Sequence, residues 1–498
     1  MPVVIGNIPP YQACNVKHLT HIREAADLQN GDIVEFLGHI ILWDENCISD
    51  KTCHEWRQQG DPLCDAALEV IFPRGSTSTG KDLLEELEQQ ALRRAEVDPN
   101  VKRFYDEVSR PPPSELLVLG EEIRTCRDFF LDNSIQIMQA LLHYSLAAGF
   151  ASPRIVKTLQ TISYLVPHGY QTMKPLSQST NDRTYTRLLE TFQFILDVMG
   201  CPSVLPAVTE SIPQPGSQAY LLPRGEGWKS AVRVRMLHGI ARRRTREKLE
   251  KSTSAGHEVD FDGIPISQED LSATLASFCI IPLWCLDRLG LKPSRKQANA
   301  YLSVWRLVGY YLGVSPQILL RYFMDLDVAN NSIPTIPILQ AVSNRPPYYT
   351  TFEYNCAVTR FFAGPELSAH LGVPEVSTRM VIKMHFMLAL QTVPVLCSKW
   401  YFRRGWARQR REILAAGLAA SVRYQLGMRR SKFRPRIEVT EDGGGELPQF
   451  ALASEKVKPM PVHGTTLSQK WNALVVEVVG VSVGAAIALW TIIHRLQY

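Results

Sequence analysis

The sequence predicts a mainly α protein, with one large helical domain followed by a C-terminal transmembrane helix. Three observations lead to this prediction. The chain has 498 residues, which is enough for a large hydrophobic core. Most apolar segments repeat at the spacing of a helix, and few alternate as strands do. Near the C-terminus, residues 474–493 are almost entirely apolar.

Composition places the body among ordinary globular proteins. Hydrophobic residues make up 45% of the chain and charged residues 21%, which excludes a polytopic membrane protein. The net charge of +5 is small for this length and does not indicate a nucleic-acid partner. Basic residues cluster at 242–248 and 403–411, where we expect solvated helix faces. Contact with an anionic membrane surface is the alternative.

Cysteine usage and the start of the chain indicate the cellular compartment. The ten cysteines are scattered, with no CxxC pair and no zinc spacing. Residues 1–10 are uncharged and interrupted by prolines, so no signal peptide is expected there. We therefore expect reduced thiols and a body that faces the cytosol.

In the first half of the chain, residues 32–43 are apolar and fit either a strand or a buried helical segment. A Gly-Asp-Pro break then precedes helical spacing that resumes at Leu63. Further helices are expected over residues 81–95, 129–150, 154–166 and 183–199.

Two helices in the second half carry clear start and stop signals. Residues 267–270 (SQED) and 294–297 (SRKQ) both resemble capping boxes, with Asp in place of the usual Glu in the first. The two helices should end at Gly290 and Gly313. The last helices of the body are expected over residues 376–394 and 406–424.

These elements predict four segments: an N-terminal part (1–38), a helical catalytic domain (39–430), a flexible tether (431–468) and a transmembrane helix (471–495). Within the catalytic domain, residues 201–222 should form a loop rich in proline and serine.

The chain's central stretch is residues 224–248, which read RGEGWKSAVRVRMLHGIARRRTREK. Arg235, His238 and Arg242 are spaced so that a helix places them on one face. A neutral imidazole on such a face can bind iron axially, and arginines beside it can hold carboxylates. A single helical histidine is more often an ordinary core or surface residue, and this spacing forms no metal cage.

The C-terminal segment 474–493 carries one charge, Glu477. At about 1.5 Å per residue, its length just crosses a hydrocarbon core. Trp471 and Trp490 suit interfacial positions, and residues 480–484 form a GxxxG that can pack on another membrane helix. The alternative is a buried helix that closes the domain. A C-terminal anchor without a signal peptide leaves the body on the cytosolic side.

Several ordered blocks resemble one known family, the rubber oxygenases (latex-clearing proteins). That family also contains the ER-bound oxygenase of mycophenolic acid biosynthesis, the MpaB type. The likeness runs from about residue 39 to about residue 426 and is densest over residues 183–314. The similar blocks are RLLET at 187–191, GEGWKSAVRVRMLHGIARR at 225–243, GIPISQEDLSATLASF at 263–278 and AYLSVWRLVGYYLGV at 300–314.

The resemblance implies a globin-like, mostly helical fold that encloses a haem b. His238 falls on the family's axial histidine and is the expected iron ligand. Arg235 and Arg242 fall on its flanking arginines, which could pair with haem propionates, and Thr274 falls on the threonine of the following helix. These four residues are the expected cofactor-binding set.

Arg187 and Thr191 fall on the family's distal-side R-x-x-x-T helix, where they could hydrogen-bond oxygen or orient the helix. An arginine there also commonly pairs only with a local glutamate. Some rubber oxygenases have a lysine before the threonine as a removable iron ligand. Here that position is Glu190, so lysine ligation is not expected. Arg187, Glu190 and Thr191 are the candidate catalytic residues, and the literal R-x-x-K-T at residues 154–158 is treated as a chance match.

The resemblance implies a membrane-tethered oxygenase, with haem b as cofactor and dioxygen as co-substrate. Its reaction would be oxidative cleavage of a C=C bond in a prenyl chain or another lipophilic substrate, by analogy in secondary metabolism. The endoplasmic reticulum is the expected membrane. Two alternatives stay open: a non-catalytic, membrane-attached lipid-binding protein, and an oxidoreductase of the same fold that uses another metal.

Overall fold

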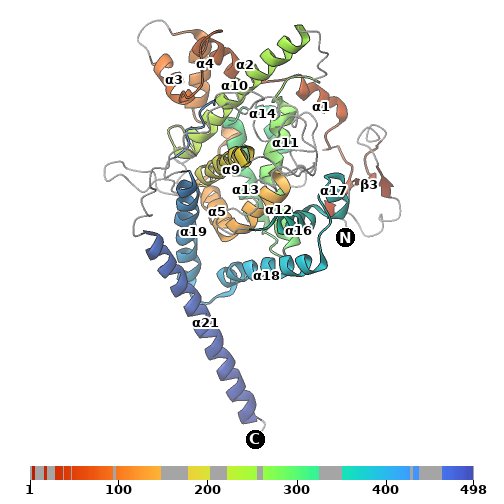
Figure 1. Ribbon diagram of the computed structural model, residues 1–498, viewed down its shortest axis with the longest axis vertical. Coiled ribbons are helices and arrows are strands. Elements are labelled where there is room, and N and C mark those ends of the chain that lie inside the picture. The colour runs from red at the N-terminus through yellow and green to blue at the C-terminus, as the bar shows by residue number, and fades with distance from the viewer. Residues whose placement is uncertain are drawn as a thin grey trace.

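The computed structural model is mainly α, as predicted, and ends in a long apolar helix (Figure 1). Its helices are α1 (Asp50–Arg57), α2 (Pro62–Ile71), α3 (Leu83–Ala91), α4 (Pro99–Ser109), α5 (Gly120–Asp132), α6 (Ser134–Ala140), α9 (Gln178–Val198), α10 (Glu226–Ser254), α11 (Gln268–Cys279), α12 (Ile281–Arg288), α13 (Arg295–Tyr311), α14 (Pro316–Tyr322), α16 (Phe352–Ala363), α17 (Pro365–His370), α18 (Thr378–Trp400), α19 (Arg404–Gln425) and α21 (His463–Leu496). The residues described are 3–5, 16–19, 28–36, 39–45, 47–92, 97–146, 178–201, 221–254, 262–324, 350–426, 430–436 and 463–496.

A small sheet stands at one side of the body. Its strands β1 (Val3–Ile5), β2 (Val16–His18), β3 (Ile33–Phe36) and β4 (His39–Leu42) lie in the order β1-β4-β3-β2. β3 and β4 pair antiparallel, with Val34 opposite Ile41. The described part of this stretch therefore forms strands at residues 33–36 and 39–42 and no helix, which decides between the two alternatives that the sequence left open.

The core is organised around α13, which lies in the middle of the body (Figure 1). It is buried along most of its length and packs against α5, α10 and α11. Trp305 contributes the largest side chain on this helix, and its ring lies 5.3 Å from that of Phe278. Both predicted capping boxes are present, at Ser267 with Asp270 and at Ser294 with Gln297.

Two predicted helices are divided in the structure. The helix expected to end at Gly290 becomes α11 and α12, separated at Ile280, because Pro282 begins a new helix there. The long stretch from residue 129 breaks at Asn133 and continues as α6 and a π-helical turn, Leu141–Ser145. Gly290 and Gly313 both adopt positive φ at helix ends, as their positions predicted.

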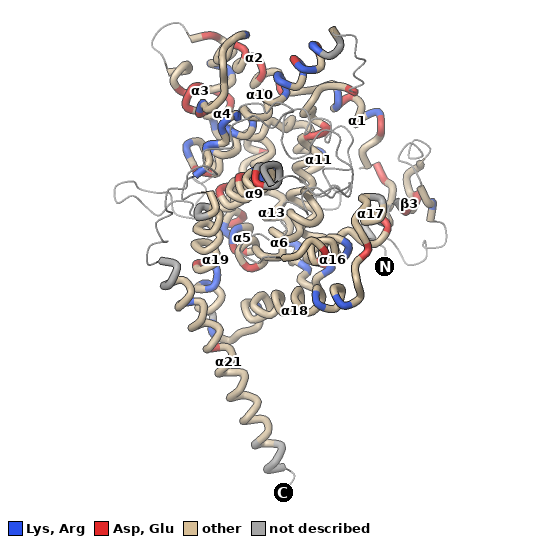
Figure 2. Tube along the Cα trace, viewed as in Figure 1, with Lys and Arg blue, Asp and Glu red and all other residues tan. Residues whose placement is uncertain are grey.

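Three helical segments of the described chain are long and apolar enough to cross a membrane: Gln268–Arg288, Thr378–Trp400 and Leu467–Trp490. The first is mostly buried in the body and the last is almost entirely exposed. α21 runs away from the body (Figure 2), and no charged residue lies between Glu477 and Arg495. The alternative of a buried closing helix does not fit this exposure.

The first residues of the predicted tether lie against the body. Residues 430–436, which we call the strap, run beside α9 and α10, and Phe433 is buried. The backbone N–H of Gly80 donates to the carbonyl of Pro435 at 2.8 Å, which fixes the end of the strap. The nine described cysteines are all free, in agreement with reduced thiols.

Candidate functional site

Helix α10 carries three of the predicted site residues and packs closely on α2. Gly239 lies directly against the side chains of α2, since a Cβ there would lie 2.5 Å from Cδ1 of Leu68 and 3.2 Å from Oδ1 of Asp65. A larger residue would push these side chains away. Arg235 and Arg242, on either side of Gly239, therefore both reach the carboxylates of α2.

Arg235 is buried and held by two carboxylates. Its Nε and Nη2 donate to Asp61 at 2.6 and 3.0 Å, and its Nη1 donates to Glu107 at 2.9 Å. Asp61 also accepts from the backbone N–H of Cys64 and so caps α2. Burial raises the pKa of Asp61, but Arg235 outweighs this and holds that pKa below its usual value.

Arg242 is also buried, and its guanidinium donates to the Asp65 carboxylate and to the carbonyl of Ile266. Burial raises the pKa of Asp65 by more than Arg242 lowers it. Both arginines thus hold carboxylates of the protein itself. The structure does not test their predicted pairing with haem propionates, which stays a prediction.

His238 lies between these arginines in sequence and is half-buried. Its Nδ1 atom is fully enclosed and has no hydrogen-bond partner. Burial and, to a smaller extent, Arg242 lower the pKa of His238 to about 4, and Asp61 opposes this shift. The imidazole is therefore neutral at pH 7, the form in which histidine binds a metal.

A second polar cluster lies on α9. Arg187 donates to Glu190 at 2.9 Å, and Glu190 also accepts from Ser431 at 2.8 Å and Arg436 at 2.6 Å, both in the strap. Burial raises the pKa of Glu190, but Arg187 and Arg436 outweigh it and lower that pKa overall. Arg187 thus pairs with the local glutamate, one of the two roles that its sequence position left open.

The two predicted threonines bond to their own helices. Thr191 donates to the carbonyl of Arg187 at 3.1 Å, and Thr274, which is exposed, donates to that of Asp270 at 2.7 Å. Neither hydroxyl joins the clusters around Arg235 or Glu190 in this structure. The residues of the R-x-x-K-T match at 154–158 lie outside the described part of the chain.

The strap shows how α9 and α10 lie relative to each other. Its start, Arg430, bonds to Asp197 near the end of α9 and to Glu226 at the start of α10. Its end, Arg436, bonds to Glu190 further back on α9 and accepts from Arg244 further along α10. The strap therefore runs with α10 and against α9, so the two helices are antiparallel.

This arrangement brings the predicted distal and axial residues to a common level. Ser230 donates to Asp197 at 2.6 Å. Counting seven residues away from this bond on each helix reaches Glu190 on α9 and Leu237 on α10. At about 1.5 Å per residue, Glu190 and His238 thus lie at a similar height along the helix pair.

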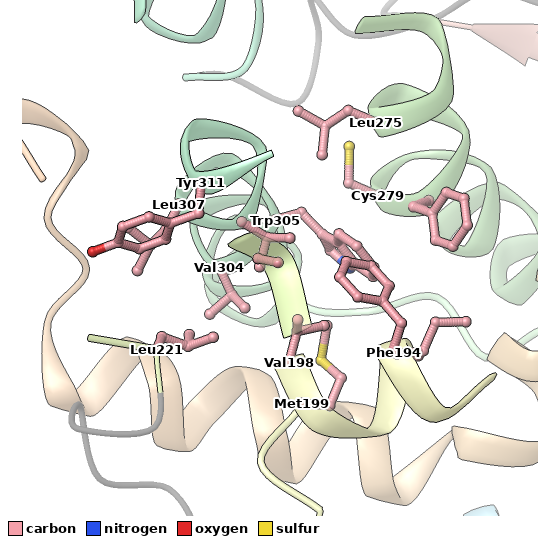
Figure 3. Close-up of a cluster of buried hydrophobic side chains, with 14 of the residues drawn as sticks. Phe194, Val198, Met199, Leu221, Leu275, Cys279, Val304, Trp305, Leu307 and Tyr311 are labelled. Atoms are coloured by element: carbon pink, nitrogen blue, oxygen red, sulfur yellow. The ribbon is translucent and has the colours of Figure 1, made fainter. Parts of the chain in front are cut away.

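An apolar interior adjoins the second half of α9. Figure 3 shows side chains of α9 meeting those of α11 and α13, among them Phe194, whose ring lies 6.3 Å from that of Trp305. Such a lining suits a lipophilic ligand. A pocket of only about 10 Å³, room for about one water molecule, borders this cluster, and none of the seven predicted site residues lines it; its lining consists of Ile123, Cys126, Arg127, Val198, Met199, Gly200, Leu221 and Val304.

Sequence reasoning missed the carboxylates Asp61, Asp65 and Glu107 and the strap residues Ser431 and Arg436. Asp61 had a signal, since it precedes Pro62 and so marks a helix start, but nothing local connects it with Arg235, 174 residues away. Arg436 is 246 residues from Glu190, so its role also depends on the tertiary fold.

Comparisons with known proteins identify the family of this chain. The family model described as "ER-bound oxygenase mpaB/B'/Rubber oxygenase, catalytic domain" matches residues 137–394. The rubber oxygenase of Streptomyces sp. (strain K30) is 32% identical over 99 residues, which cover 20% of this chain and 23% of that relative. No solved structure matches the chain.

The family model covers more than half of the chain, and the protein belongs to the MpaB/rubber oxygenase catalytic-domain family. It is accordingly a member of an oxygenase family. All seven predicted site residues lie within the matched region, whereas α2, α4 and the strap lie outside it. The aligned part spans under a quarter of the Streptomyces relative.

Proposed function

We propose that this protein is a membrane-tethered, haem b-dependent oxygenase that cleaves a C=C bond in a prenyl chain or another lipophilic substrate. The observation that carries the proposal is His238, a neutral histidine with an enclosed, unpartnered Nδ1, on the helix where the family has its axial ligand. A buried nitrogen without a partner costs about 1–3 kcal/mol, so a native protein that keeps one has a use for the imidazole.

The residues around His238 fit a haem better than a metal held by side chains alone. Among the described residues, no three His, Cys, Asp or Glu side chains gather as a metal site. A single histidine is sufficient for a haem, because the porphyrin supplies four of the iron ligands. When bound, the haem would supply the activation of dioxygen.

The protein's own contribution would be to hold and orient. His238 would bind the iron, and burial, assisted by Arg242 beside it, keeps the imidazole neutral. Arg235 and Arg242 fix α10 to α2, and we propose that they also face the haem propionates. Arg187, Glu190 and Thr191 would set the polarity of the distal side on α9, and Thr274 would line the same pocket from α11. The apolar side chains between α9 and α13 would exclude water and accept the lipophilic chain.

We further propose that α21 anchors the protein in the endoplasmic reticulum membrane, with the body on the cytosolic side. The family's description as ER-bound and the exposed apolar length of α21 support this. The orientation is supported by arginines at 403, 404, 408, 410 and 411, close to where α21 leaves the body, because basic flanks stay in the cytosol. Anchoring raises the local concentration of a substrate that partitions into the bilayer.

The first test is the visible absorption spectrum of the detergent-purified full chain, with haem quantified as the pyridine haemochrome. We expect near-stoichiometric haem b, loss of haem in His238→Ala, and recovery on adding imidazole, which can occupy the vacated ligand position. His385→Ala, at an exposed position of α18, is the matched control and should keep its haem. Unchanged haem content in folded His238→Ala would refute the proposal.

Activity is tested separately, by oxygen uptake with prenylated compounds and polyisoprene and by detection of carbonyl products. The oxygenase proposal requires uptake in the wild type and none in His238→Ala. Lipid binding that persists in both proteins without any uptake would support the non-catalytic alternative instead. A colourless protein with a stoichiometric metal of another kind would support an oxidoreductase of the same fold that uses that metal.

A further inference from the structure

Helix α18 presents an apolar stripe to solvent. Its side chains at 382, 386, 390, 393, 396 and 400 recur at the spacing of one helix face, and all are exposed. Phe386 is 66% and Trp400 82% exposed, and Phe402 just beyond the helix is 74% exposed. Large aromatic side chains gathered in this way on a protein surface mark an interaction site.

The opposite face of α18 is already used. Met384 and Leu388 are buried in a hydrophobic cluster with α16, and Val395 is fully buried. The backbone of α18 is therefore fixed to the body along its length, and the stripe is directed outward. Its exposure is a consequence of the fold and not of a helix that lacks its packing partner.

The charges of α18 are all of one sign. The helix contains Arg379, Lys383 and Lys399 and no Asp or Glu. At 3.6 residues per turn, Lys383 and Lys399 lie about 100° to either side of the stripe. An apolar face bordered by lysines, with aromatic residues at one end, is the pattern of a helix that lies in the plane of an anionic membrane surface.

The end of α18 adjoins the base of α21. Directly after α18, Tyr401 donates to Glu477 at 3.0 Å, and Arg403 pairs with the same carboxylate. Trp406 donates to the carbonyl of Leu474 at 3.2 Å. The uncharged part of α21 begins after Glu477, so the exposed stripe of α18 and the exposed surface of α21 meet at this corner of the molecule.

From these observations we infer that α18 lies in the membrane interface, with its stripe in the acyl-chain boundary, as a second membrane contact beside α21. This inference rests on the membrane anchoring in the proposed function. α18 runs across the base of the body while α21 leads away from it (Figure 1). Because α18 is packed on α16 in that orientation, it lies along the bilayer surface that α21 enters.

The contact would give the substrate a short path. A body held by one helix alone can stand away from the bilayer, whereas a body that also rests on α18 stays in contact with it. A lipophilic substrate could then pass from the acyl chains to the apolar interior without crossing water. The partner is the lipid surface itself, and anionic lipids should strengthen the contact through Arg379, Lys383 and Lys399.

The test uses the full chain reconstituted in phosphatidylcholine–phosphatidylserine vesicles whose lipids carry nitroxides either near the headgroup or near the chain end. The nitroxide quenches only tryptophans that touch lipid. Trp400 reports on α18 and Trp490 on α21, and each is isolated as the difference between wild type and Trp400→Phe or Trp490→Phe. Trp305→Phe, in the buried core, is the control and should remove no lipid quenching.

In the vesicles, we expect the headgroup nitroxide to quench the fluorescence of Trp400 several-fold. In detergent controls without vesicles, we expect no such quenching of Trp400. Quenching of Trp490 without quenching of Trp400 would overturn the inference and leave the anchor intact; a dimer that covers the stripe would give this result. Quenching of Trp400 alone would support the inference and remove the transmembrane role of α21. Absence of both would refute the anchoring and the inference together.

Discussion

Two ion-pair networks flank α10, and they differ in the exposure of their arginines and in what they join. On the α2 side, Arg235 and Asp61 each keep only 6% of their side-chain surface exposed, and Arg242 keeps 2%. On the α9 side, Arg187 and Arg436 are 19% and 18% exposed. The first network joins elements of the helical body; the second joins α9 to the strap.

The network on the α2 side is therefore structural, and the network on the α9 side is adjustable. A buried charge that loses its partner costs far more than a partly hydrated one, so the α2 side fixes α10 and hence His238. The α9 side can lose one bond and keep others, because Glu190 has three partners. We therefore expect stability to depend mainly on the α2 side, in a graded order that the following changes test.

The largest effect is expected for Asp61→Ala, which leaves the buried Arg235 with only Glu107. The free energy of unfolding should fall by about 3–5 kcal/mol, the usual cost of breaking a buried pair. Urea unfolding of the detergent-solubilised full chain measures it. Glu107→Ala removes the more exposed partner of the same arginine and should cost about 1 kcal/mol or less. Equal losses of unfolding free energy in the two variants would mean that the deeper burial of Asp61 does not make it more important for stability than Glu107.

The pH dependence of stability should report His238. Its pKa is about 4 in the folded protein against 6.5 unfolded, so the unfolded chain binds more protons between these values. Stability should therefore rise from pH 4 to pH 6.5 and fall on acidification, with His238 contributing on the order of 2–3 kcal/mol. The measurement compares unfolding of haem-free wild type and His238→Gln across this range, because an imidazole bound to iron would not take up the proton. Parallel curves for the two proteins would contradict the assigned burial.

Gly313→Ala tests the same network from α13. Gly313 has φ +89, and a Cβ there would lie 2.5 Å from Oδ2 of Asp61 and 2.8 Å from Nε of Arg235. We expect a loss of about 2 kcal/mol from backbone strain and displacement of the pair. Gly290→Ala, at φ +71 with open space around it, isolates the strain and should cost about 1 kcal/mol. Thermal unfolding of both variants separates the two contributions.

The smallest effect is expected on the α9 side. Ser431→Ala removes one of three bonds to Glu190 and should lower the free energy of unfolding by about 1 kcal/mol. It should also speed tryptic cleavage at Arg430 and Lys432, because the strap is released more often. Ser254→Ala, at an exposed hydroxyl in the last turn of α10, should change neither quantity. A loss as large as that of Asp61→Ala would make the strap part of the rigid core.

The sequence was sufficient for the parts of this protein that have local signals. Capping boxes at Ser267 and Ser294 and the glycines at 290 and 313 marked helix ends correctly, because these signals act within a few residues. The shared face of Arg235 and Arg242 followed from helical spacing. Their partners could not be predicted, since Asp61 and Asp65 approach only when α2 packs on Gly239. The docking of the strap was hidden for the same reason, in a segment whose composition is that of a tether.

The bonds that Tyr401, Arg403 and Trp406 make to the base of α21 limit how the body can rotate relative to that helix. A protein tied to its anchor only by loose chain tumbles freely above the membrane, on a nanosecond timescale. Here α21 is bonded to the start of α19, and Arg411 of α19 pairs with Asp128 and Asp132 of α5. Under the anchoring proposed above, rotation of α21 is therefore transmitted to the centre of the body. The whole molecule would then rotate as one rigid unit at the slow rate of a membrane helix, with the same side always facing the bilayer.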